Sequence, residues 1–177
     1  MSQTNYNEQA VAFAGLLAEG FEPNLKVSAL QGEVSAEIPF GYFVKQSTPP
    51  VAGGPTPTIV ALPSAGTDDI AGCVIHSHDY DKRLDLGDTG VKPKRILNLL
   101  RKGRIWAMAD KAVTFDDEVY VRYTAAGSQL VGMLSDSADS NKCLQLFGAR
   151  FITETTALGL VLVEFDLSAH FAIKQNA

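Results

Sequence analysis

The stretch that decides the fold lies in the middle of the chain and reads Ile96-Leu97-Asn98-Leu99-Leu100-Arg101-Lys102-Gly103-Arg104-Ile105-Trp106-Ala107-Met108. Its two apolar halves flank the tripeptide Arg101-Lys102-Gly103. Glycine adopts a positive φ angle without steric cost, and tight turns between antiparallel strands need such a residue. The stretch therefore predicts a β-hairpin whose turn carries basic side chains.

Strand-like segments recur on both sides of this stretch. They are rich in β-branched and aromatic residues, or they alternate apolar with polar residues, and turn residues separate them. They span residues 36–44, 58–62, 72–78, 118–123, 130–134, 143–147, 150–155 and 158–167. Short strands at intervals of about 8–12 residues are typical of all-β domains. The sequence predicts a mainly β fold, either an antiparallel barrel or a jelly-roll-like sandwich.

The chain of 177 residues has the length of one domain. We expect residues 1–24 to form an extended or partly helical arm and residues 25–177 to form a single β-rich domain. The apolar run from Val11 to Ala18 is broken by glycines and suits a free amphipathic helix poorly. The arm exposes Phe13, Leu16, Leu17 and Phe21 unless something covers them. It is interpreted as an interaction arm, and packing against its own domain is the open alternative.

Composition excludes several classes of protein. Hydrophobic residues make up 46% and charged residues 20%, which is too apolar for general disorder. No apolar run approaches the roughly 20 residues of a membrane span, and the first residues lack the features of a signal peptide. We expect an unexported chain without membrane contact. A net charge of -5 disfavours binding of the whole chain to nucleic acid. Cys73 and Cys143 are expected to be buried free thiols.

Catalytic motifs are weak. His76 and His78 lie two residues apart, so in a strand both imidazoles point to one side and could begin a metal site. A small β-barrel metalloenzyme of the cupin kind is therefore one alternative function. The glutamate and the later histidine that cupins add at characteristic spacings are not found. The structural interpretation is two hydrogen-bonded histidines at a strand end, and we expect no cofactor.

A basic cluster stands out in this acidic chain. It comprises Lys92, Lys94, Arg95, Arg101, Lys102 and Arg104. A solvated hairpin, an electrostatic contact to an acidic protein surface and a nucleic-acid-binding barrel are three interpretations of it. Trp106 shares one strand face with Arg104 and Met108 and is expected in the core or at a subunit interface.

Several segments together resemble the structural cement, or capsid decoration, proteins of tailed bacteriophages. They are the apolar arm 12–18, Ile38-Pro39-Phe40-Gly41-Tyr42-Phe43-Val44, the loop 78–81, the stretch 99–106, Val119-Tyr120-Val121-Arg122-Tyr123, Gly148-Ala149-Arg150-Phe151 and Val161-Leu162-Val163-Glu164-Phe165-Asp166-Leu167. The resemblance covers residues 12–167. The Pro/Gly-rich loop after Gln46 and the pair His76 and His78 depart from the family pattern.

The resemblance implies a non-enzymatic virion protein on the outside of an icosahedral capsid. Such a protein bridges major capsid subunits and stabilises the expanded, DNA-filled head. The major capsid protein and a second copy, in a homodimer or homotrimer, are the expected partners, and assembly would occur in the host cytoplasm. The expected capsid or subunit contacts are Phe13, Leu16, Leu17, Phe21, Arg101, Lys102, Arg104 and Trp106.

Overall fold

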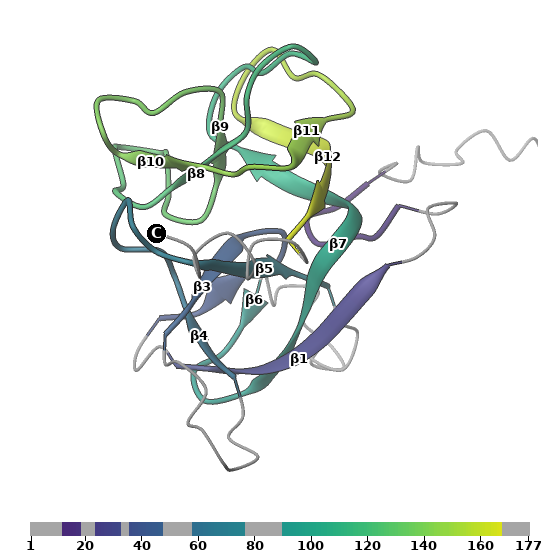
Figure 1. Ribbon diagram of the computed structural model, residues 1–177, viewed down its shortest axis with the longest axis vertical. Coiled ribbons are helices and arrows are strands. Elements are labelled where there is room, and N and C mark those ends of the chain that lie inside the picture. The colour runs from purple at the N-terminus through teal and green to yellow at the C-terminus, as the bar shows by residue number, and fades with distance from the viewer. Residues whose placement is uncertain (1–11, 19–23, 33–35, 48–57, 77–89, 168–177) are drawn as a thin grey trace, which may run out of the picture.

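The computed structural model describes residues 12–18, 24–32, 36–47, 58–76 and 90–167 (Figure 1). Within these ranges all regular structure is β-strand. The described residues contain no helix that is long and apolar enough to cross a membrane. The twelve strands found there are β1 (Leu25–Gln31), β2 (Ile38–Pro39), β3 (Phe43–Gln46), β4 (Ile59–Ala61), β5 (Ile70–Val74), β6 (Gly90–Val91), β7 (Ile96–Ala109), β8 (Tyr120–Arg122), β9 (Leu134–Ser135), β10 (Cys143–Gln145), β11 (Ala149–Phe151) and β12 (Gly159–Asp166).

Five strands close into a barrel in the order β1-β4-β3-β5-β7, and β7 returns to pair with β1. The pairing of β1 with β4 is parallel, and the other four pairings are antiparallel. Apolar side chains fill the interior, namely Ala29, Ile38, Phe40, Val44, Val60, Val74, Val91, Leu97 and Leu99. The predicted mainly β fold is confirmed, in its barrel form.

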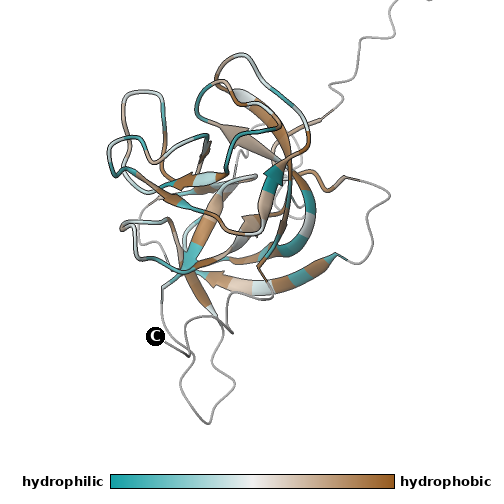
Figure 2. Cartoon of the chain, turned by 45° about the horizontal axis from the view of Figure 1, so that its top comes forward, coloured by the Kyte–Doolittle hydropathy of each residue, from teal (hydrophilic) through white to brown (hydrophobic). Residues whose placement is uncertain are grey.

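A second group of strands lies above the barrel (Figure 1). β12 runs antiparallel along the second half of β7, and β11 pairs with β12. β9 connects the end of β7 to β8, which pairs with β10. We call this group the upper lobe. Figure 2 shows apolar colour on the strands and more hydrophilic colour on the loops of this lobe. Both cysteines are buried free thiols, as predicted.

The predicted hairpin is wrong, because residues 96–109 form one continuous strand, β7. Leu97 and Leu99 face the barrel core, whereas Ile105, Ala107 and Ala109 face the core of the upper lobe. Both groups carry odd residue numbers, yet they face different cores. The face of β7 to which odd-numbered side chains point therefore changes between Leu99 and Ile105. Its pairing with β1 skips one residue there, because Leu25 lies opposite Lys102 and Lys26 opposite Leu100. This β-bulge bends the strand from one core to the other.

The tripeptide that resembles a turn forms this bulge. Gly103 has a φ angle of 134°, and a Cβ atom there would collide with the side-chain oxygen of Asn24. The chain does not reverse at Gly103, because β1 binds one edge of β7 before the bulge and β12 binds the other edge after it.

The segment 36–44 was expected to be one strand and forms two. A turn at Gly41, whose φ angle is 74°, separates β2 from β3. A Cβ atom at Gly41 would lie 2.8 Å from the backbone nitrogen of Gly15, which is closer than real Cβ contacts. The turn therefore packs directly against the N-terminal arm.

Candidate interaction surface

Residues 12–18 of the arm extend along the edge of β7. The Gly15 N–H donates to the Trp106 carbonyl at 2.7 Å, and the Trp106 N–H donates to the Leu16 carbonyl at 2.9 Å. The Ala18 N–H donates to the Arg104 carbonyl at 3.1 Å. This part of the arm thus adds to β7 as a short antiparallel segment, without helix. Phe21, also expected at an interface, lies outside the described residues.

His76 anchors the arm through its backbone and its ring. Its N–H donates to the Gly15 carbonyl at 3.0 Å. The imidazole lies 4.7 Å from the Phe13 ring and 4.6 Å from the Phe40 ring, measured between centroids. His78 lies outside the described residues. Among the described residues, no three His, Cys, Asp or Glu side chains gather as a metal site would require.

The arm presents two of its apolar side chains outward. Leu17 pairs with the buried Ile105 and packs against the core of the upper lobe. Because side chains alternate along an extended segment, Leu16 lies on the other side, opposite Trp106. Phe13 is 39% exposed. Phe13 is therefore the exposed apolar residue of the described arm, and the half-buried Leu16 lies on the same side as Trp106.

The outward face of β7 is charged at one end and apolar at the other. Lys102, Arg104, Trp106 and Met108 alternate with buried residues and are all half-buried. Their cross-strand partners on β12 are Asp166, Glu164, Leu162 and Leu160. Trp106 is therefore neither a fully buried core residue nor a fully exposed one. The face combines an apolar strip with a ladder of ion pairs.

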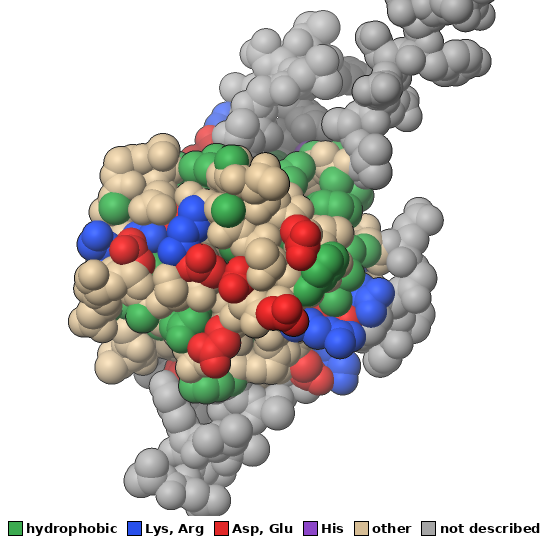
Figure 3. Space-filling view, turned by 90° about the horizontal axis from the view of Figure 1, so that it is seen from above, with side chains coloured by type: hydrophobic (Ala, Val, Ile, Leu, Met, Phe, Trp, Pro, Cys, Tyr) green, Lys and Arg blue, Asp and Glu red, His purple; other side chains and the backbone are tan. Residues whose placement is uncertain are grey.

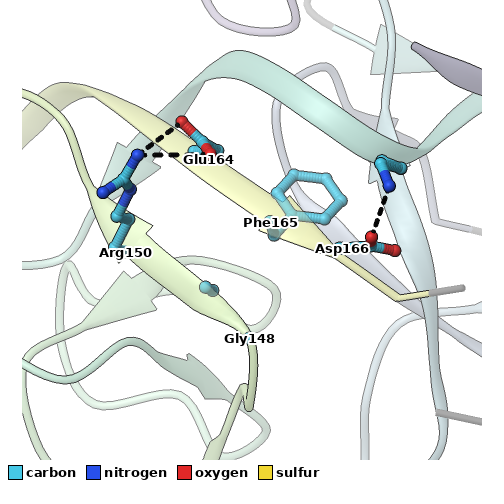
Figure 4. Close-up of a pocket in the computed structure, with 7 residues that line it drawn as sticks. Gly148, Arg150, Glu164, Phe165 and Asp166 are labelled. Carbon is cyan, nitrogen blue, oxygen red and sulfur yellow. Dashed lines mark hydrogen bonds and ion pairs between the residues drawn. The ribbon is translucent and has the colours of Figure 1, made fainter. Parts of the chain in front are cut away.

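The ion pairs border a shallow hollow of about 310 Å³, which the paired strands β11 and β12 line together with Lys102 of β7 (Figure 4). Lys102 lies 2.7 Å from Asp166, and Arg104 lies 2.7 Å from Glu164. Arg150 on β11 reaches the same glutamate at 3.2 Å. Opposite charges within the chain thus already compensate Lys102 and Arg104.

The basic cluster does not form one patch. The Arg101 carbonyl accepts a hydrogen bond from the Leu167 N–H at 2.9 Å, and its guanidinium donates to the Leu167 carbonyl at 3.5 Å. Lys94 and Arg95 lie exposed before the start of β7, at the far end of the barrel from Arg104. Three of the six cations thus precede β7, and the other three, Arg101, Lys102 and Arg104, lie in its middle. Among the described residues, these six cations therefore do not form the single basic stripe that a nucleic-acid interpretation requires.

A family profile described as "Structural cement protein (E217 gp24/Pam3 gp6)" matches residues 2–166 of the chain. The chain belongs to this structural cement protein family. It is accordingly a structural virion protein that stabilises a capsid, as the sequence resemblance implied. No curated protein matches the chain.

The cement protein also has a counterpart of similar fold among solved structures. A chain described as "The capsid of Myoviridae Phage XM1" superposes on it with a TM-score of 0.64 at 17% sequence identity. The match covers 94% of this chain and 97% of that chain. At this level of identity the likeness concerns the fold, and it extends over both the barrel and the upper lobe.

A buried ion-pair network in the upper lobe of the cement protein was missed from the sequence. The Arg122 Nε donates to Asp110 at 2.6 Å, and both side chains are fully buried. The Arg122 Nη2 donates to Asp139 at 2.8 Å, and Nη1 donates to the Thr124 carbonyl at 3.2 Å. The loop 135–142 is therefore tied to the core. The 118–123 alternation gave no signal of this burial, because Arg122 falls on the same face of the predicted strand as Glu118 and Tyr120.

Surface and near-surface carboxylates of the cement protein are stabilised in their charged form. Partial burial alone would raise the pKa of Glu164, but the hydrogen bonds from Arg104 and Arg150 outweigh it and lower the pKa. The hydrogen bond from Arg122 holds the pKa of Asp139 below its usual value. Asp68 has a lowered pKa because the Ser64 and Ala65 N–H groups and Lys45 outweigh its burial.

We therefore expect the cement protein to lose stability in acid. A carboxyl group whose pKa is lower in the folded state stabilises the fold above its unfolded pKa, which is about 4. This stabilisation disappears as the pH falls through the lowered folded pKa. Urea unfolding should show a constant free energy from about pH 7 to 5 and a decline below about pH 4.5. The variant Glu164→Gln should show a shallower decline, and stability that rises toward acid would contradict the expectation.

Proposed function

We propose that this cement protein binds the outside of an icosahedral phage shell and bridges neighbouring major capsid subunits. By doing so it stabilises the expanded, DNA-filled head after assembly in the host cytoplasm. Phe13, Leu16 and Trp106 form the main contact with the shell. The observation that supports this surface is the exposure of Phe13 at 39% on an arm whose next residues pair with β7 beside Trp106.

The chemistry of this surface suits a protein contact. Apolar and aromatic side chains at the centre of an interface supply most of the binding energy, while charged side chains at its rim set register and association rate. Here Trp106 and Met108 occupy the apolar end of the β7 face, and Arg104 begins the ion-pair ladder beside them. Charge reversal of Lys102 should therefore slow binding more than it weakens the final complex.

Repetition over the shell explains how a modest contact can stabilise a large particle. Each copy that touches two capsid subunits makes the second contact intramolecular, which raises its effective concentration. The arm contributes to this contact as a segment docked on β7 rather than as a free peptide, so less conformational entropy is lost on binding.

The test uses expanded shells that lack this protein. Purified wild-type chain is added to the shells, bound protein is measured after pelleting, and the temperature of shell rupture is recorded. We expect the wild-type chain to bind and to raise the rupture temperature. The variant Phe13→Ala/Trp106→Ala should bind at least about tenfold more weakly, which corresponds to about 1.4 kcal/mol or more. Its own free energy of unfolding should fall by only about 1–3 kcal/mol, because both rings are partly exposed.

Phe147→Ala serves as the matched control. Phe147 is 61% exposed but follows β10, where it lines a hollow with Asp68 and Ile70 rather than the β7 face. This variant should bind shells as the wild-type chain does. A wild-type chain that neither binds shells nor raises their rupture temperature would overturn the proposed function. Equal binding by the Phe13/Trp106 double variant and the wild-type chain would overturn the choice of surface.

A further inference from the structure

The lower end of the barrel carries an exposed apolar residue beside two cations. Ile96 begins β7 and is 63% exposed, and the preceding residues Lys94 and Arg95 are exposed as well. Lys94 adopts a left-handed φ angle of 61°, and the Gln31 N–H donates to the Arg95 carbonyl at 3.0 Å. The turn is thus held against the end of β1. We call Lys94, Arg95 and Ile96 the basic tip.

The opposite end of the molecule carries exposed apolar residues beside carboxylates. The loops there follow β7 and precede β12, and paired hydrogen bonds between Val113 and Thr155 at 2.9 and 3.1 Å hold them together. Phe115 is 56% and Leu158 is 41% exposed. We call this the acidic tip, and it comprises Phe115, Leu158 and the exposed Asp116, Glu118 and Glu154.

The figures place the two tips at opposite ends of the long axis. Figure 1 shows β7 rising from the bottom of the barrel to the loops of the upper lobe. Figure 3 looks down on that upper end, where acidic side chains spread over the centre and basic side chains lie toward the sides. The two tips flank opposite ends of β7, a continuous strand of 14 residues, so they do not touch each other within one chain (Figure 1).

We infer that the acidic tip of one copy docks on the basic tip of a second copy, head to tail. Each tip offers at least one large apolar side chain that is more than 40% exposed, and the charges around these side chains are opposite in sign. This complementarity makes a second copy of the chain the fitting occupant of each tip. The inference rests on the proposed function only in placing these contacts on a shell, where neighbouring copies meet.

Head-to-tail contacts are heterologous, so they generate closed rings or open chains rather than isolated pairs. On a curved shell, copies bound around a local symmetry axis can close such a ring. The arm and the outward face of β7 lie between the tips, so contacts at the tips leave Phe13 and Trp106 available to the capsid.

Sedimentation velocity on the purified chain tests this inference. Wild-type protein at up to about 0.5 mM should associate reversibly, and raising sodium chloride from about 50 to 500 mM should weaken the association at least about tenfold. The variants Lys94→Glu/Arg95→Glu and Asp116→Lys/Glu118→Lys should each associate at least about tenfold more weakly than the wild type. A chain with all four reversals restores opposite signs at the two tips and should associate as the wild type does.

Lys26→Glu, a reversal of an exposed charge on β1 outside both tips, should leave association unchanged. A wild-type chain that remains monomeric, or association that both double reversals leave intact, overturns the inference. Failure of the four-reversal chain to regain association overturns it as well. Shell binding is measured in parallel. Monomeric protein that still binds shells removes only this inference, whereas associating protein that does not bind shells removes only the proposed function.

Discussion

Replacing Arg122 by methionine is expected to lower the free energy of unfolding by about 3–5 kcal/mol. The substitution removes the guanidinium that pairs with Asp110 at 2.6 Å, where both side chains are fully buried. Asp110 would remain buried without the guanidinium that pairs with it, and Asp139 would lose the hydrogen bond that Arg122 donates to it. Urea unfolding at neutral pH measures the loss.

Two further variants separate this cause from general damage. Arg122→Met/Asp110→Asn removes the uncompensated charge and should recover part of the lost stability, since an apolar or neutral replacement of a whole buried pair is often tolerated. Arg150→Met removes the same side chain from an ion pair whose arginine is 65% exposed, and it should cost less than about 1 kcal/mol. If Arg122→Met and Arg150→Met proved equally destabilised, the network would not stabilise the upper lobe as argued.

The fold class was readable because strand patterns are local. Alternation in residues 118–123 and the apolar run 158–167 predicted β8 and β12 from their own residues, and turn residues marked most strand ends. Such local patterns could not predict that the barrel closes. It depends on β1 meeting both β4 and the distant β7, and no local period encodes which edges pair.

The error at Arg101-Lys102-Gly103 has the same origin. A glycine with a positive φ angle after two charged residues suits a hairpin turn and a β-bulge equally well. The bulge forms instead of the turn because β1 pairs with β7 before Gly103 and β12 pairs with β7 after it. The expected hairpin would have brought Lys94 and Arg104 close together, which is why they were assigned to one basic cluster. In the continuous strand β7, Lys94 precedes the first residue and Arg104 lies beyond the bulge.

The candidate surface was predicted in part. Residue type alone drew attention to Phe13, Leu16, Arg104 and Trp106, and the arm brings the first two to the strand that carries the last two. The ring contacts of His76 with Phe13 and Phe40 could not be read from the sequence, because both phenylalanines lie more than 25 positions away from it. The Arg122 network was missed because a buried charge looks like a surface charge in sequence.

The docked arm leads to the second large effect, which is expected for Gly15→Ala. Gly15 has a φ angle of 82°, and a Cβ atom there would lie 2.6 Å from the backbone nitrogen of His76 and 3.0 Å from the Val74 carbonyl oxygen. Backbone atoms of β5 and its continuation cannot move aside without disturbing the barrel. The arm should therefore leave its place beside β7, while the strands β1 to β12 remain folded.

The undocked arm changes three observables. Hydrogen exchange at the Trp106 amide should accelerate, because its acceptor is the Leu16 carbonyl. The free energy of unfolding should fall by roughly 2–3 kcal/mol. Binding to shells should weaken at least about tenfold, because Phe13 and Leu16 would have to be ordered again at the moment of contact.

Gly127→Ala provides the control that isolates packing from backbone strain. Gly127 also has a positive φ angle, 62°, but a Cβ atom there meets nothing within 4 Å. Gly127→Ala should lower the free energy of unfolding by about 1–2 kcal/mol, which is the strain of a left-handed backbone conformation in alanine. Shell binding and hydrogen exchange at the Trp106 amide should match those of the wild-type chain. If Gly15→Ala matched Gly127→Ala in exchange and in shell binding, the close packing of the arm on His76 would have no part in decoration. If it lost shell binding while Trp106 stayed protected, the arm would act through contacts other than its docking on β7.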